Sequence, residues 1–83
     1  MVDLIDTIAD WSIITDGGEV DGETWPYITA VQHPAYLDAW IEVEEYNFPD
    51  DAEAGHKRWV EALKGDLPDY IVDIAGKVYK CKR

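Results

Sequence analysis

The chain has 83 residues and a formal net charge of −11, which set the first limits on what it can be. This length fits one domain with a modest hydrophobic core, and a hydrophobic content of 47% argues against general disorder. A surface with this charge repels the phosphates of nucleic acids and the headgroups of anionic membranes, so we expect neither as a partner.

The charges are divided unevenly along the chain. Residues 1–56 contain fourteen Asp and Glu and no Lys or Arg, whereas residues 57–83 contain four acids and all seven bases. An acidic surface attracts a basic surface on another protein and speeds its association. Cys81 is the single cysteine, the N-terminus has no basic signal-peptide region, and no apolar run approaches the roughly 20 residues that span a bilayer. We therefore expect a soluble cytoplasmic protein.

The first segment predicts a short amphipathic helix over residues 2–10. Its apolar residues fall near helical spacing, with acidic and polar residues between them: Val2, Leu4, Ile5, Ile8 and Trp11. The following WSIIT either continues this helix or forms a strand, because its β-branched residues favour extended backbone. DGGEVDGE, residues 16–23, then predicts a glycine-rich acidic turn.

Two strands are predicted next. Residues 25–31 form the first, with Pro26 at its beginning or on an exposed edge, and QHPAYLD connects it to the second. Residues 39–46 alternate along the second strand, so Ile41 and Val43 are expected to face the core. The opposite face then carries an acidic strip bracketed by two aromatic residues: Trp40, Glu42, Glu44 and Tyr46.

The main helix is predicted to begin at residue 50. Asp50 as N-cap and Glu53 at the third helical position form a capping box, and Gly65 is the expected stop. One apolar stripe runs along this helix: Ala52, His56, Trp59, Val60 and Leu63. Gly55 lies beside the stripe, so we expect the helix to approach the sheet closely there.

A β-hairpin is predicted at the end of the chain, where residues 70–74 and 77–81 flank Ala75 and Gly76. The order of the elements predicts an α+β fold for a single acidic domain of residues 1–83. We expect a small antiparallel sheet of three to four strands, one main helix packed on a face of it, and a short N-terminal helix.

Two segments, ETWPYITAV and WIEVEEYNFPDDAEAGHKRWVEAL, resemble a group of small uncharacterised bacteriophage proteins. The resemblance covers about residues 23–64 and rests on a first strand with ET, a second strand, and a helix that opens with an acidic-Ala-Gly-His run. WPYIT departs from the shorter apolar strand start of that group. The group has no assigned activity to transfer to any residue. The resemblance implies a phage origin, and therefore an accessory protein that acts on host machinery.

Few residues suggest catalysis or metal binding. His56 could pair with Glu53 in acid–base chemistry or with His33 on a metal, but HExxH and the Cys/His spacings of zinc sites are absent from the sequence. We expect His56 to lie at the core boundary and to form hydrogen bonds nearby. Cys81 has no histidine at a spacing typical of a nucleophile, and the acids of DGGEVDGE do not match a calcium-binding EF-hand loop. We therefore expect no enzyme, no metal and no cofactor.

The strip on the second predicted strand is the candidate site for partner binding. Aromatic anchors beside acids are typical of an interface with a Lys- or Arg-rich partner, and neighbouring acids complete the set: Trp40, Glu42, Glu44, Tyr46, Glu45 and Asp38. A solvated strand face explains the same pattern, and so does coverage of Trp40 by the N-terminal helix. At the level of the sequence these alternatives stay open.

The function expected from these features is a binding module. We expect a small acidic phage accessory protein that occupies a basic, nucleic-acid-binding surface of a host protein in the host cytoplasm, as an anti-CRISPR or anti-restriction inhibitor mimicking nucleic acid does. The alternative is a virion or assembly component that self-associates through exposed strands. Adaptation to high salt is a further explanation of the acidity. Neither the identity of the partner nor the oligomeric state follows from the sequence.

Overall fold

A computed structural model describes residues 2–82, apart from the side chains of Leu37 and Asp38. Four long strands follow one another and precede a 14-residue helix: β1 (Val2–Ile8), β2 (Trp11–Val20), β3 (Glu23–His33), β4 (Leu37–Tyr46) and α1 (Pro49–Ala62). Two short strands follow the helix: β5 (Tyr70–Val72) and β6 (Val78–Lys80).

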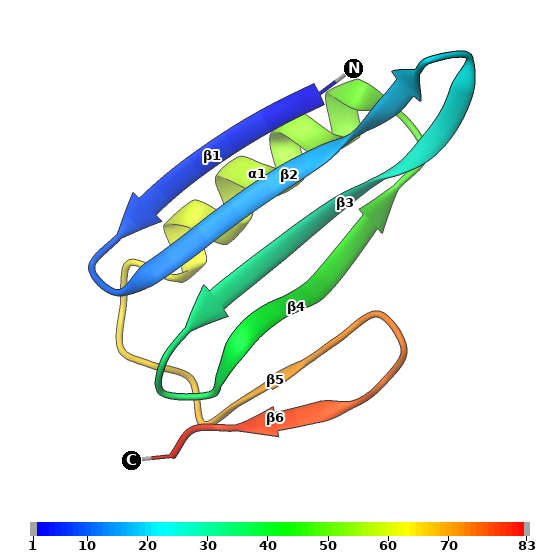
Figure 1. Cartoon of the computed structure of the whole chain (residues 1–83). Coiled ribbons are helices and arrows are strands. Elements are labelled where there is room, and N and C mark those ends of the chain that lie inside the picture. Colours follow the sequence, from blue (N-terminus) through cyan, green and yellow to red (C-terminus); the bar gives the residue numbers. More distant parts are fainter. Residues whose placement is uncertain (1, 83) are drawn as a thin grey trace.

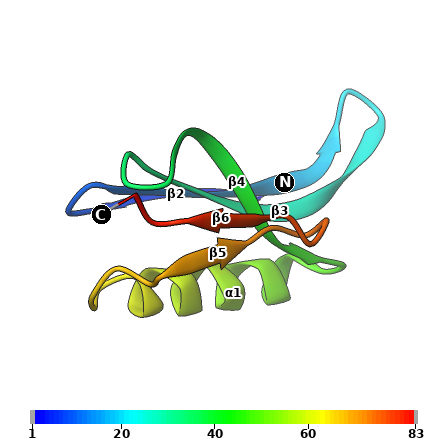
Figure 2. The same cartoon turned by 90° about the horizontal axis from the view of Figure 1, so that it is seen from below.

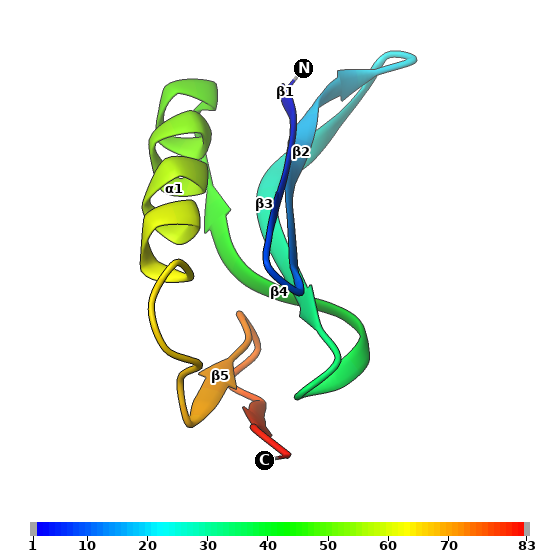
Figure 3. The same ribbon diagram turned by 90° about the vertical axis from the view of Figure 1, so that its left-hand side faces the viewer.

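The four long strands form one antiparallel sheet in the order β1-β2-β3-β4, so each strand pairs with its neighbour in sequence (Figure 1). α1 crosses one face of this sheet and contacts all four strands. The β5–β6 hairpin lies beyond β4, on the side of α1 (Figure 3). Figure 2 shows the sheet above α1, and no other element of the described chain covers its upper face.

The predicted N-terminal helix over residues 2–10 is wrong, because β1 occupies this segment. The fold is therefore a four-stranded sheet with one helix and a second, two-stranded sheet, and not the predicted sheet with two helices. Residues 9 and 10 form a tight turn, so that Ile8 lies opposite Trp11 and the rest of β1 pairs with β2. The apolar pattern also satisfies a period of two, which turns alternate side chains toward α1: Val2, Leu4 and Ile8.

The predicted turn over residues 16–23 is mostly strand. Only Asp21 and Gly22 form the turn, and both have positive φ angles, 53° and 80°, as a two-residue hairpin turn requires. Gly17 lies at a bulge where β2 shifts register against β3, and a side chain there would overlap the backbone of Pro26 and Tyr27. The glycines of this segment therefore shape the β2–β3 hairpin.

α1 confirms the predicted main helix but begins differently. It starts at Pro49, and Phe48 is the N-cap without a side-chain cap hydrogen bond, so the predicted capping box of Asp50 and Glu53 is wrong. Proline suits the first helical position because its φ angle is fixed and the N–H that it lacks would have no helical partner there. Asp50 stands in the first turn instead, where its charge interacts favourably with the helix dipole.

Gly55 confirms the close approach of helix and sheet that the sequence predicts there. A Cβ atom at this position would overlap the ring of Tyr46 from β4. His56, the next residue, is also buried against the sheet. α1 ends at Ala62, before the predicted stop at Gly65.

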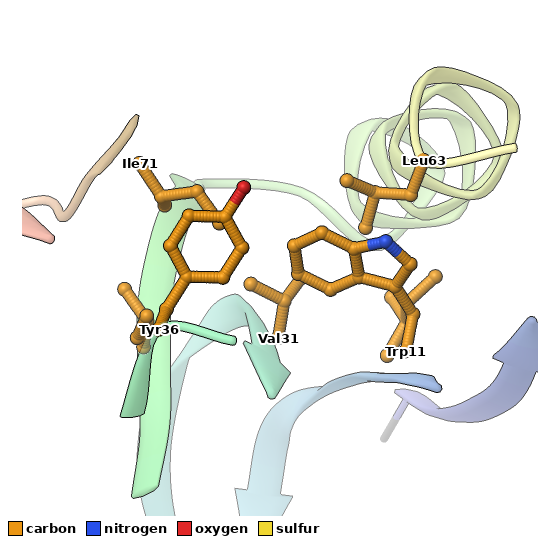
Figure 4. Packing of buried hydrophobic residues seen from close by; sticks show 7 residues of the cluster. Trp11, Val31, Tyr36, Leu63 and Ile71 are labelled. Carbon is orange, nitrogen blue, oxygen red and sulfur yellow. The ribbon is translucent and has the colours of Figure 1, made fainter. Parts of the chain in front are cut away.

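The hydrophobic core lies between the sheet, α1 and the hairpin. Its larger cluster draws residues from the strands, the β3–β4 connection, the C-cap of α1 and the hairpin (Figure 4): Trp11, Ile13, Val31, Tyr36, Ile41, Leu63 and Ile71. A smaller cluster lies under the first turns of the helix: Val2, Tyr46 and Ala52. Both clusters lie on the α1 side of the sheet.

The predicted β-hairpin is confirmed, with shorter strands than residues 70–74 and 77–81. The Asp73 carboxylate accepts hydrogen bonds from the backbone N–H groups of Ala75 and Lys77, both at 2.9 Å. These bonds, above all the one from Lys77, hold the pKa of Asp73 below its usual value. The N–H of Ile74 donates to the carbonyl of Glu42 at 2.9 Å, which attaches the hairpin to β4.

Candidate functional site

A bulge in β4 changes the direction of the side chains that follow it. Thr29 of β3 lies opposite Glu44 and Ala30 lies opposite Glu42, so Val43 is an extra residue between the two pairs. Because of this residue, the alternation of side chains along β4 shifts by one position. Glu44 and Glu42 consequently point to opposite faces of the sheet.

The six residues predicted to bind a partner therefore do not form one strip. Three of them are exposed on the face turned away from α1: Trp40, Glu42 and Glu45. Glu44 and Tyr46 point toward α1, and Tyr46 is only 7% exposed. The predicted placement of these two residues on the binding face is wrong. The side chain of Asp38 lies outside the described part of the chain.

A chain of hydrogen bonds runs beneath α1 from β1 to β4. It links six side chains in this order: Asp6, His56, Thr15, Thr29, Tyr46 and Glu44. The successive donor–acceptor distances are 2.7, 2.7, 2.5, 3.0 and 2.7 Å. Within residues 2–82, every buried side-chain N or O atom that the structure describes has a hydrogen-bond partner. The hydrogen-bond chain thus connects β1, β2, β3 and β4 with the helix.

His56 confirms the expectation of a core-boundary histidine that forms hydrogen bonds nearby. Its Nε2 lies 2.7 Å from Asp6 and its Nδ1 lies 2.7 Å from Thr15. Glu53 is exposed, and the Nδ1 atom of His33 accepts the backbone N–H of Ala35 at 3.0 Å. Neither of these two residues is a partner of His56.

Asp6, His56 and Thr15 follow the order carboxylate, imidazole, hydroxyl of a nucleophilic triad. Thr15 is 0% exposed, however, and its hydroxyl lies 2.5 Å from that of Thr29. A substrate cannot reach this oxygen without displacing α1. We therefore assign the arrangement to the attachment of the helix, where an unsatisfied buried polar group costs about 1–3 kcal/mol.

The side chains in this hydrogen-bond chain determine how many of its links can hold a proton at once. Thr15, Thr29 and Tyr46 each supply one proton, and a neutral imidazole supplies one more. The five links between the two terminal carboxylates therefore all hold a proton when His56 carries both ring protons, or when one terminal carboxyl is protonated.

Three donors of the protein itself converge on one carboxylate oxygen of Glu44. Its Oε1 accepts the hydroxyl of Tyr46 at 2.7 Å, a guanidinium N–H of Arg58 at 3.1 Å and the indole N–H of Trp59 at 3.2 Å. Burial raises the pKa of Tyr46 to about 12, against the opposing effect of its hydrogen bond with Thr29. The Glu44 carboxylate therefore serves the fold by joining β4 to α1.

The face of the sheet turned away from α1, called the open face below, offers a different surface. The pairing register places residues of all four strands on it: Asp3, Ile5, Thr7, Ser12, Ile14, Asp16, Ile28, Ala30, Gln32, Trp40, Glu42 and Glu45. Ile5 is 67% exposed and Trp40 is 46% exposed. The open face is thus an uncovered sheet surface with a large apolar content.

Acids surround the apolar residues of the open face: Asp3, Asp16, Glu42 and Glu45. All seven Lys and Arg belong to α1 or to the segment that follows it. Asp3 and Asp16 are directly paired across β1 and β2. Favourable cross-strand pairs stabilise a sheet by about 0.2–1 kcal/mol each, whereas like charges in such a pair destabilise it. Strand pairing does not explain the Asp3–Asp16 pair, which favours a role in binding.

Two shallow hollows adjoin each other on the open face. The first extends toward the β2–β3 turn and is lined by Asp16, Gly17, Val20, Trp25, Pro26 and Ile28. The second extends toward β4 and is lined by Ile14, Asp16, Ile28, Ala30, Trp40 and Glu42. Each hollow combines one tryptophan with a carboxylate and aliphatic side chains. The sequence analysis missed Asp16 and Trp25. The alternation within WSIITD could have placed Asp16 beside Ile14, whereas the alternation within WPYITA groups Trp25 with Tyr27 and Thr29 and gives no signal for its place in this hollow.

No family model, curated protein or solved structure matches the chain. The described residues contain no group of three or more His, Cys, Asp and Glu placed to hold a metal ion. Their helix is too short and too polar to cross a membrane. The open face is therefore the candidate functional site on the strength of its own chemistry.

Proposed function

We propose that this protein is a binding module whose open face docks on a basic surface of another protein. The observation that carries the proposal is an uncovered sheet face on which acids surround apolar side chains and to which the described residues contribute no Lys or Arg. Burial of the apolar residues supplies affinity, the exposed Trp40 supplies an anchor, and the acids select and steer a basic partner.

The partner surfaces that fit this chemistry best are those that bind nucleic-acid phosphates, because such surfaces present Lys and Arg. A protein docked there excludes nucleic acid. The resemblance to small bacteriophage proteins extends the proposal to an accessory protein that acts in the host cytoplasm on a nucleic-acid-handling host protein. An inhibitor of the anti-CRISPR or anti-restriction type is the proposed class.

Self-association through exposed strands, as in a virion or assembly component, fits the charges less well. β1 is an edge of the sheet and carries Asp3 and Asp6, so pairing of two β1 edges would bring carboxylates of both copies together. The opposite edge, β4, is attached to the hairpin through Ile74 and Glu42. Both edges are therefore poorly suited to pairing between copies.

The proposal is tested by affinity capture from bacterial lysate with the wild-type protein and two variants of equal charge. The face variant carries Asp16→Lys and Glu42→Lys, and the control carries Glu53→Lys and Asp66→Lys, two exposed acids outside the open face. Wild type and control are expected to retain a basic nucleic-acid-binding protein that high salt or duplex DNA releases, and the face variant is expected to lose it. Equal retention by both variants, or retention that DNA does not affect, contradicts the proposal.

A further inference from the structure

The hollow in front of Trp40 brings three kinds of surface together. Its floor is aliphatic and comes from two neighbouring strands: Ile14, Ile28 and Ala30. Trp40 contributes a ring that is 46% exposed, and Asp16 and Glu42 contribute exposed carboxylates. A ligand that fits all three surfaces needs a methylene stem, a flat group that stacks on an indole, and positive charge.

The two carboxylates lie on either side of the central strand of this hollow. Asp16 is paired with Ile28 and Glu42 with Ala30, so the two acids are separated by β3 and by two residues along it. From strand spacing and rise, their Cα atoms are about 12 Å apart. The side chains of Asp16 and Glu42 therefore leave space for one flat cation between them, which can donate hydrogen bonds to both carboxylates.

Neither carboxylate has a partner within residues 2–82. Asp16 and Glu42 form no side-chain hydrogen bond and no ion pair with the residues that the structure describes. On the α1 side of the same sheet, an equivalent combination is complete: Glu44 of β4 accepts from Arg58 at 3.1 Å and from Trp59 at 3.2 Å. The open face therefore repeats a carboxylate beside a tryptophan but has no arginine of its own.

Arginine matches this hollow better than lysine does. The guanidinium group is planar and weakly hydrated, stacks on aromatic rings, and presents N–H donors on several edges. Its methylene stem covers aliphatic surface. The ammonium group of lysine is compact and strongly hydrated, so it gains less from the ring.

We infer that the hollow lined by Trp40, Asp16 and Glu42 is the seat of an arginine side chain of the partner protein. The inference rests on the proposed function and narrows it. The partner inserts an arginine over Trp40, and the rest of the open face contacts the partner surface around that arginine. The exposed tryptophan and the two unpaired carboxylates then share one role.

The test uses three end-capped peptides, Gly-Gly-X-Gly-Gly, in which X is arginine, lysine or citrulline. Citrulline has nearly the shape of arginine without its charge. Titration into isotopically labelled protein, followed by NMR, is expected to shift the Trp40 indole N–H and the amides of Ile14 and Ala30 saturably with the arginine peptide. The lysine peptide is expected to bind several-fold more weakly, and the citrulline peptide is expected to give no saturable shift.

Variants locate the effect. Trp40→Leu keeps an apolar side chain but removes the ring, and is expected to weaken binding of the arginine peptide about three- to tenfold. Glu42→Gln is expected to weaken it by a similar factor. Trp25→Leu, in the adjoining hollow, is the matched control and is expected to leave the affinity unchanged. Circular dichroism checks that each variant is folded.

The outcomes separate this inference from the proposed function. Equal binding of arginine and citrulline peptides, shifts that map away from Trp40, or equal effects of Trp40→Leu and Trp25→Leu overturn the arginine seat. If capture by the wild type still depends on Asp16 and Glu42 in that case, the proposed function stands without it. If capture does not depend on these acids, the proposed function is wrong. The peptide titrations then measure arginine selectivity at Trp40 on their own.

Discussion

Replacing Gly55 by alanine tests how closely α1 lies on the sheet. A Cβ atom there would overlap ring atoms and the hydroxyl of Tyr46. The ring is held in place, since its hydroxyl lies 3.0 Å from the hydroxyl of Thr29 and donates to Glu44 at 2.7 Å. Either the helix moves outward or the ring leaves these partners, and both changes disturb buried groups.

The magnitude follows from opposing effects. Alanine favours a helix interior by about 1 kcal/mol relative to glycine. Overpacking costs about 1–3 kcal/mol, and a buried polar group that loses its partner costs about 1–3 kcal/mol more. For Gly55→Ala we therefore expect a net loss of about 1–5 kcal/mol in the free energy of unfolding. Urea denaturation followed by tryptophan fluorescence measures it.

The same substitution in a Tyr46→Leu background is expected to have the opposite effect on stability. Tyr46→Leu removes the atoms that a Cβ at residue 55 would overlap, so Gly55→Ala is expected to stabilise this variant by up to about 1 kcal/mol. The packing described here is refuted if Gly55→Ala stabilises the wild-type protein, or if its effect is the same in both backgrounds.

Three further predictions concern the fold. Ala9 has a φ angle of 51°, so Ala9→Gly is expected to raise the free energy of unfolding by about 0.5–1 kcal/mol, whereas Ala54→Gly on the exposed side of α1 is expected to lower it by about 1 kcal/mol; thermal melts compare the two. Trp11 is buried and Trp59 is half-buried, so Trp11→Ala is expected to lower the free energy of unfolding by about 3–5 kcal/mol and Trp59→Ala by less. Urea denaturation measures both, and equal losses would contradict the prediction. Because burial raises the pKa of Tyr46 from 10.0 to about 12, its contribution to stability is complete below pH 10 and is lost as the pH rises to 12. Alkaline unfolding of Tyr46→Phe, followed by circular dichroism, is expected to lack this component, and an unchanged pH profile would contradict it.

The sequence predicts those parts of the fold that depend on local chemistry. The close approach at Gly55, the hairpin around residues 75 and 76, and the strand containing Tyr27 follow from single residues or short patterns, and the structure confirms them. The helix predicted over residues 2–10 fails because its apolar spacing suits both periods. A tight turn at Ala9 and pairing with β2 decide for the strand, and neither is a property of the segment alone.

The candidate site could be predicted only in part. Trp40, Glu42 and Glu45 follow from the composition of one strand and lie on the open face. The bulge at Val43 depends on the register of β3, so strict alternation placed Glu44 on the wrong side. Of the other residues, Ile28 and Ala30 lie in a strand that the sequence predicts. Asp3, Ile5 and Asp16 lie where the sequence predicts a helix and a turn, so they are not recognised as part of this face.

The most direct measurement of the central claim is methyl cross-saturation NMR with the basic protein retained by affinity capture. Saturation of the partner is expected to attenuate the methyl signals of three isoleucines on the open face: Ile5, Ile14 and Ile28. Ile74, which is 45% exposed on the hairpin, serves as the internal control and is expected to keep its intensity. Attenuation of Ile74 with unchanged signals from the open face would place the partner elsewhere and contradict the account.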